Sequence, residues 1–243
     1  MGLLIGPTGT FGRNMTIELI SQPAATAAKI QMNRGDVVTA EVGAMIAMSP
    51  QITVETTSRN RGGSGGFLKG VKRMFSGESY FLNHFTSHQD SGEIILGPSL
   101  IGDIAHHQLN NATLIVQSSG WLAACGDIDI DTTWQGLGAA IFGGEGLFWV
   151  KCSGRGDVLL NSFGAIYEID CDGEYCVDTS HIVAYEETLN FSISKASSGW
   201  ISSFLSGEGF VCNFQGRGKI YCQTHSPSDF GKNLGPNLKP VRQ

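Results

Sequence analysis

Histidines are the residues of this chain best suited to metal or acid–base chemistry. His84 and His88 stand four positions apart and His106 and His107 are adjacent, with carboxylates close in sequence. Imidazole and carboxylate are common ligands of protein metal sites. On a strand, however, residues four apart are about 13 Å apart, and adjacent side chains point to opposite faces. A metal-dependent β-fold enzyme would need strand pairing to bring His84 to His106 or His107, so we expect ordinary polar histidines.

Three aspartates, Asp127, Asp129 and Asp131, alternate along one stretch and would share one face of a strand. A calcium site needs six or more oxygen ligands, usually supplied by a loop. We therefore expect a solvated acidic strand face, which also discourages pairing at a sheet edge.

Six cysteines follow residue 124, and two of them flank an expected turn. Cys171 and Cys176 lie on either side of Asp172-Gly173-Glu174 and could meet across a hairpin. Their spacing is not that of a zinc knuckle, and no second such pair exists. Cys152, Cys212 and Cys222 stand singly in apolar patterns. We expect buried thiols and no cysteine nucleophile.

Two Gly-Arg-Gly segments invite a phosphate-binding interpretation. Gly154 and Gly156 bracket one arginine, and Gly216 and Gly218 bracket the other. Neither segment matches a dinucleotide or P-loop fingerprint. Glycines with positive φ at tight turns between strands explain the pattern more simply.

Three apolar segments could form a docking surface. In the first, basic residues alternate with apolar residues at helical spacing, which suits a surface that faces anionic lipid. The alternative is that these segments are simply core. The residues of this expected partner or membrane face are Phe67, Leu68, Lys69, Val71, Lys72, Arg73 and Phe75 in the first segment, Leu137, Ile141 and Phe142 in the second, and Trp200, Ile201, Phe204 and Leu205 in the third.

Composition excludes several classes of protein. Among 243 residues there are 33 glycines and 7 prolines but no Gly-X-Y period, which excludes collagen. Apolar residues make up 41% and net charge is −6, which disfavours disorder. The stretch from Leu137 to Val150 is too short and too interrupted to span a membrane, and the N-terminus does not resemble a signal peptide. We expect a soluble cytoplasmic protein, peripheral to a membrane at most, with reduced cysteines.

Charge is unevenly distributed, with 8 basic and 4 acidic residues up to residue 73 and 8 basic and 18 acidic residues after it. Nucleic-acid binding usually needs a basic surplus on the binding domain. RNA binding is therefore an alternative that the acidic later part of the chain disfavours.

An internal repeat organises the chain. Apolar positions alternate at matching offsets in three copies, as two short strands would require. The matching positions are Val38, Leu114 and Tyr175; Ala47, Ala123 and Ala184; Ile52, Ile128 and Leu189; Val54, Ile130 and Phe191; and the glycines Gly77, Gly144 and Gly207, each followed by glutamate.

The repeat predicts an all-β chain of three sandwich-like units, at residues 15–110, 111–172 and 173–226. Residues 1–14 are expected to form a disordered leader and residues 227–243 a flexible tail. Each unit is near the lower size limit for an independent core, so we expect the units to pack together as a pseudo-trimer.

These features resemble a known family. The stretch FLKGVKRMFSGESYFLNHF from Phe67 to Phe85, the three Gly-Glu pairs, and Ile182-Val183-Ala184 are similar to the altered-inheritance-of-mitochondria family. The resemblance covers residues 15–226 and implies a fold similar to that of the tryptophan RNA-binding attenuation protein. It also implies a bacterial-type member without an agreed biochemical function, and it brings no catalytic residues.

Together these observations predict a non-enzymatic scaffold or binding module without a cofactor. Its partner would be a membrane surface or another protein, and the chain could form a homo-oligomer. RNA binding by analogy of fold and a metal-dependent enzyme built on His84, His106 or His107 are the alternatives.

Overall fold

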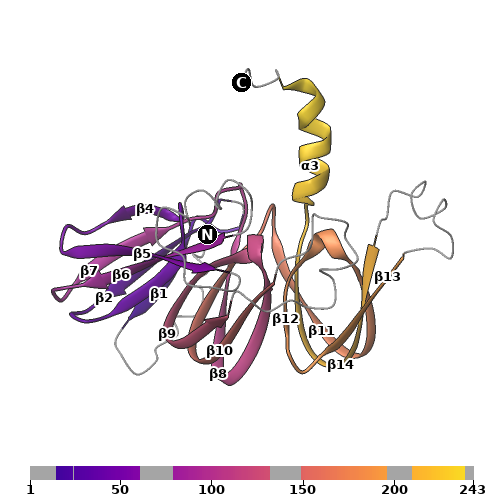
Figure 1. Ribbon diagram of the computed structural model, residues 1–243, viewed down its shortest axis with the longest axis horizontal. Coiled ribbons are helices and arrows are strands. Elements are labelled where there is room, and N and C mark those ends of the chain that lie inside the picture. Colours follow the sequence, from indigo (N-terminus) through magenta and orange to yellow (C-terminus); the bar gives the residue numbers. More distant parts are fainter. Residues whose placement is uncertain (1–14, 24, 61–78, 132–148, 196–209, 239–243) are drawn as a thin grey trace, which may run out of the picture.

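A computed structural model describes residues 15–23, 25–60, 79–131, 149–195 and 210–238. Antiparallel strands make up most of this part of the chain (Figure 1). The strands are β1 (Thr16–Ile20), β2 (Ala27–Met32), β3 (Val37–Glu41), β4 (Met45–Met48), β5 (Ile52–Asn60), β6 (Ser79–Ser87), β7 (Gly92–Leu96), β8 (Ile104–Gln117), β9 (Trp121–Asp131), β10 (Trp149–Asn161), β11 (Ile166–Asp178), β12 (Ile182–Glu186), β13 (Asn190–Lys195) and β14 (Phe210–Gln223).

Side-chain alternation explains why these segments form strands. In β2, Ala28, Ile30 and Met32 are buried while the residues between them are half-exposed, and β7 has the same period of two. The short 3₁₀ turns η1 (Ser118–Gly120) and η2 (Thr179–His181) connect β8 to β9 and β11 to β12. The expected all-β architecture is thus confirmed for the described residues.

Two sheets result. One has four strands in the order β1-β2-β7-β4, and the other has ten, in the order β11-β14-β12-β8-β10-β9-β3-β6-β5 with β13 beside β14. In Figure 1 the strands β1 to β7 form the left part of the molecule, β8 to β10 the middle, and β11 to β14 the right. A closed pseudo-trimer would need a further pairing between the left and right parts, and none is present among the described strands.

Three apolar clusters fill the molecule, and each includes side chains from a neighbouring part. The first joins Ile30 and Ile94 to Ala123 of β9. The second is centred on β8, β9 and β10 and includes Leu82 of β6 and Ala184 of β12. The third, around Tyr185 and Phe214, takes in Ile115 and Trp149. The three parts are joined by two strand pairs, β3–β9 and β8–β12, which we call the joints. The apolar clusters are therefore shared across these joints.

The expected unit boundaries lie inside strands. Residues 110 and 111 fall in the middle of β8, and residues 172 and 173 fall in the middle of β11. Asn111 and Gly173 have φ values of +54° and +116°, which redirect the strand without ending it. One strand thus serves two differently oriented parts of the molecule, where the sequence analysis placed a boundary between units.

The glycines that were expected at tight turns also lie inside strands. Gly154 and Gly156 belong to β10, at a shift in its register with β8, and Gly216 and Gly218 belong to β14. Gly77, Gly144 and Gly207 lie outside the described residues.

The C-terminal segment differs from the expected flexible tail. It forms the helix α3 (Pro227–Leu234) and the turn η3 (Gly235–Asn237), and α3 projects away from the strands in Figure 1. Proline occupies the first turn, and the side chain of Ser226 accepts a hydrogen bond from the Asp229 amide. Among the described residues no helix has the length and apolar character to cross a membrane.

Connecting segments cross at a buried polar junction. The Thr26 hydroxyl donates to the Asp103 carboxylate at 2.5 Å, and the Ser162 amide donates to the Asp103 carbonyl. Gly102 passes so close to this crossing that a Cβ atom would lie 1.7 Å from the Ser162 carbonyl oxygen. The junction therefore has no space for a side chain at Gly102.

Gly102→Ala should destabilise the protein by about 1–3 kcal/mol, because the added methyl group meets backbone that is itself hydrogen-bonded. Thermal unfolding followed by circular dichroism measures the change. Gly231→Ala is the matched control, because its helical position in α3 has open space around it and should lose no stability. Equal melting temperatures for Gly102→Ala and the unmodified chain would contradict this account of the junction.

Candidate functional site

His84 lies on β6 as a bridge between neighbouring strands. Its Nδ1 is 3.0 Å from the Thr39 hydroxyl of β3, and its Nε2 is 2.8 Å from the Thr57 hydroxyl of β5. His88, just beyond the same strand, contacts the Thr53 hydroxyl at 2.8 Å. Both ring nitrogens of His84 therefore take part in contacts between strands.

His106 and His107 lie on β8 and have different partners. His106 Nε2 is 2.6 Å from the Asp157 carboxylate, which Gln108 also contacts. His107 Nδ1 is 2.7 Å from the Tyr221 hydroxyl, and the two rings pack edge to face. Burial lowers the pKa of His107 and raises that of Tyr221, so both groups are neutral at pH 7.

The structure does not bring the three candidate metal ligands together. His84 contacts β3 and β5, His106 contacts β10, and His107 contacts β14. Within the described ranges no group of three or more His, Cys, Asp or Glu side chains is arranged to hold a metal ion. The histidine cluster of the metal-enzyme hypothesis is therefore not formed in this part of the chain.

The acidic strand is β9. Asp127 and Asp129 are exposed and Asp131 is half-exposed, as expected for a solvated face. β3 pairs with β9 only as far as Cys125, so the acidic half of β9 is paired with β10 alone among the described strands. The carboxylates thus line an open sheet edge, where their charge opposes further pairing.

The cysteines are free thiols, and five of the six are buried. Burial raises the pKa of Cys152, Cys212 and Cys222 to about 12, so these thiols stay protonated and unreactive at neutral pH. Cys171 and Cys176 do not meet across a hairpin, because both lie on β11. Their odd separation of five places them on opposite faces, one buried and one exposed.

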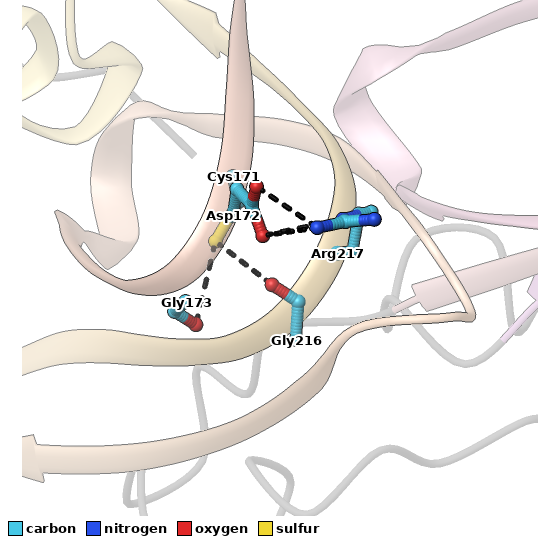
Figure 2. A network of polar contacts seen from close by, with 5 residues as sticks. All are labelled: Cys171, Asp172, Gly173, Gly216 and Arg217. Atoms are coloured by element: carbon cyan, nitrogen blue, oxygen red, sulfur yellow. Dashed lines mark hydrogen bonds and ion pairs between the residues drawn. The ribbon is translucent and has the colours of Figure 1, made fainter.

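Arg217, the arginine of the second Gly-Arg-Gly segment, makes an ion pair across two strands. Its guanidinium contacts both Asp172 oxygens, with nitrogen–oxygen distances of 3.0 to 3.2 Å (Figure 2). Asp172 and Arg217 lie directly opposite each other on β11 and β14. Nearby, the Cys171 thiol lies 3.9 Å from the carbonyl oxygens of Gly173 and Gly216. The arginine thus pairs with a carboxylate across the β11–β14 ladder and already has an anionic partner.

The apolar segments expected to form a partner or membrane face lie outside the described residues, from Phe67 to Phe75, Leu137 to Phe142 and Trp200 to Leu205. The strands on either side of each are described. Strands β5 and β6, β9 and β10, and β13 and β14 are antiparallel neighbours, so each segment lies in the connection of one hairpin.

Sequence reasoning missed the buried polar junction. Asp103 and Ser162 are buried and bonded to each other, and Gln223 accepts a hydrogen bond from the Phe163 amide and donates to the Ser180 carbonyl. The one local sign of the junction in the sequence was a polar residue, Asp103, directly before the strand β8. That signal is weak, because such residues are usually exposed.

Comparison with known proteins gives a consistent result. The model of the family described as mitochondrial biogenesis AIM24 matches residues 17–225. An uncharacterised protein of Streptococcus pyogenes serotype M6 is 31% identical over 229 residues, which are 93% of this chain and 88% of the relative. The X-ray structure of another Streptococcus pyogenes protein has a TM-score of 0.74 and 28% identity, and the match covers 93% of this chain and all of that one. The chain therefore belongs to the mitochondrial biogenesis AIM24 family and is similar to its bacterial members.

Proposed function

We propose that this protein is a non-enzymatic scaffold or binding module. The proposal rests on what the side chains best suited to chemistry contact in the structure. His84, His106 and Arg217 each contact a neighbouring strand, and the buried cysteines remain protonated. Catalysis would need such groups to converge on a substrate. Here they stabilise the pairing of strands instead.

The finer arrangement that we propose is three equivalent units in one chain. Matching positions of the sequence repeat lie opposite one another in the same way in each part of the sheet. The cross-strand sets are Val38, Phe85 and Val54; Leu114, Cys152 and Ile130; and Tyr175, Phe214 and Phe191. Their common pattern supports a triplicated unit. A fold like that of the attenuation protein, and an arrangement of the three units as a pseudo-trimer, stay predictions.

The proposed binding face consists of the three apolar segments. They are the connections of β5–β6, β9–β10 and β13–β14, which are corresponding hairpins of the proposed units. The first segment carries Lys69, Lys72 and Arg73 among apolar residues. Such a composition suits the surface of an anionic membrane, where apolar insertion and charge attraction act together.

Vesicle co-sedimentation of the full chain tests this face. Binding to vesicles of phosphatidylcholine with phosphatidylserine should exceed binding to phosphatidylcholine alone. Reversing two charges with Lys69→Glu and Lys72→Glu should weaken binding at least about tenfold. Arg34→Glu with Lys232→Glu makes the same change in net charge elsewhere and should have a smaller effect. Equal loss in both double variants, or no binding by the unmodified chain, would contradict a membrane-binding face.

Glu41, at the end of β3, is a carboxyl with a raised pKa, and we assign it a structural role. Burial raises the pKa of this carboxyl to about 7. A carboxyl with a raised pKa binds its proton more tightly in the folded state. Its contribution to stability is therefore complete below pH 4.5 and is lost as pH rises through 7.

Glu41→Gln should raise the free energy of unfolding at pH 8 by about 1–3 kcal/mol and change it little at pH 4.5, because glutamine carries no charge to bury. Thermal melting across this pH range measures the difference. Glu55→Gln, at an exposed position on β5, serves as the control and should not change the shape of the pH profile. A parallel shift of the Glu41→Gln profile at every pH would contradict the assignment.

A further inference from the structure

We propose that copies of this chain associate head to tail, with β4 of one copy pairing with residues 175–177 of β11 in the next copy. The proposal does not depend on the function proposed above. It follows from two joints inside the chain and from two strand edges, one at each end of the molecule, that lack the corresponding partner.

The two internal joints have the same register. At the β3–β9 joint, Ala40 lies opposite Ala123. At the β8–β12 joint, Val116 lies opposite Ala184. Val116 follows Ala40 by 76 positions and Ala184 follows Ala123 by 61, the offsets that relate the copies of the sequence repeat. The remaining pairs of each joint match in the same way, so one contact geometry occurs twice.

Strand β4 corresponds to the strands that make these joints. Ala47 of β4 lies opposite Ile95 of β7, just as Ala123 lies opposite Leu159 and Ala184 opposite Tyr221. The other edges of β9 and β12 pair with β3 and β8. Among the described strands, β4 has β7 as its one partner, so its joint-forming edge is open.

The exposure of the β4 side chains agrees with the absence of a partner on this edge among the described strands. All four residues of β4 are exposed, and Ile46 reaches 62%. The corresponding residues Leu122 and Val183 are 0% and 1% exposed. Sheet edges in contact with water usually carry charge or proline, whereas β4 is Met-Ile-Ala-Met. An apolar and uncharged edge is typical of a strand that pairs.

The opposite edge is on β11. Tyr175 is 46% exposed, whereas Val38 and Leu114, its counterparts on β3 and β8, are completely buried by the strands paired across the joints. β11 pairs with β14 alone among the described strands. Residues 175–177 therefore need a strand equivalent to β9 or β12, and β4 is the equivalent strand without a partner.

A second copy is the occupant that the geometry favours. β4 lies in the left part of the molecule in Figure 1 and β11 in the right part, with β8 to β10 between them. Continuing the register of the internal joints places Ala47 opposite Val177 and Met48 opposite Cys176. Because the two surfaces differ, the contact is heterologous, and successive copies form a ring or an open fibre.

A disulfide experiment tests the register. Cys176 is exposed, and Met48→Cys places a second thiol directly opposite it in the proposed joint. Mild oxidation of this variant should give a ladder of linked chains on a non-reducing gel, with the 48–176 peptide pair identified by mass spectrometry. Adding Cys176→Ser should abolish the ladder, and the exposed control Leu238→Cys should not link to position 176. A 48–176 link within single chains, or no link, would overturn the proposal.

Charged substitutions test the association itself. The mass of the unmodified chain should rise with concentration in analytical ultracentrifugation. Ile46→Lys and Tyr175→Lys should each weaken self-association at least about tenfold, because each buries an unpaired charge in the joint. Leu238→Lys, at an apolar position outside the joint that is about as exposed as Ile46, should leave self-association unchanged.

Mixing the two variants gives a sharper result. The Ile46→Lys chain keeps an intact β11 edge and the Tyr175→Lys chain keeps an intact β4 edge, so the mixture should form dimers and stop there. The proposed head-to-tail contact would be contradicted if the unmodified chain stayed monomeric at every concentration. It would also be contradicted if the mixture of the two variants stayed monomeric.

Discussion

Antiparallel pairing across the joints between its three parts is the interaction on which this structure depends. β3 with β9 and β8 with β12 share only three residue pairs each, yet they join strands that would otherwise form separate sheets. Ala123 therefore packs with Ile30 and Ile94, and Ile115 packs with Tyr185. Each part is near the lower size limit for an independent core, and side chains shared across the joints enlarge the core of each part.

This constraint gives several polar residues of the described strands a structural role. A sheet built from three parts must hold its register at many points, because a slip of one residue would expose the apolar face. The contacts of His84 with two threonines and of Arg217 with Asp172 act on such points. The buried bond between Thr26 and Asp103 similarly holds two connecting segments together.

Much of the fold could be predicted from the sequence, because alternation of side chains is a local property. Alternation around Ala47, Ala123 and Ala184 predicted strands, and these residues lie in β4, β9 and β12. The aspartates of β9 were assigned correctly to a solvated face. Features that depend on distant residues could not be predicted. Glycine between polar residues suggested turns at Gly154 and Gly173, but pairing with neighbouring strands keeps both residues within β10 and β11. Nothing local indicated that Asp103 is buried, since its partners are 59 and 77 positions away.

The continuous strands β8 and β11 also restrict how such a chain can change length during evolution. An insertion of one residue near Asn111 or Gly173 would reverse the facing of every side chain that follows in the strand. Length can vary without this penalty only in the connections between strands. The matching alanines are 76 and then 61 residues apart. The connection of the β5–β6 hairpin accounts for 9 of the 15 extra residues, since Val54 and Phe85 are 31 positions apart and Ile130 and Cys152 are 22 apart. The other 6 lie between Phe85 and Leu114, where connections on either side of β7 replace the continuous strand β10.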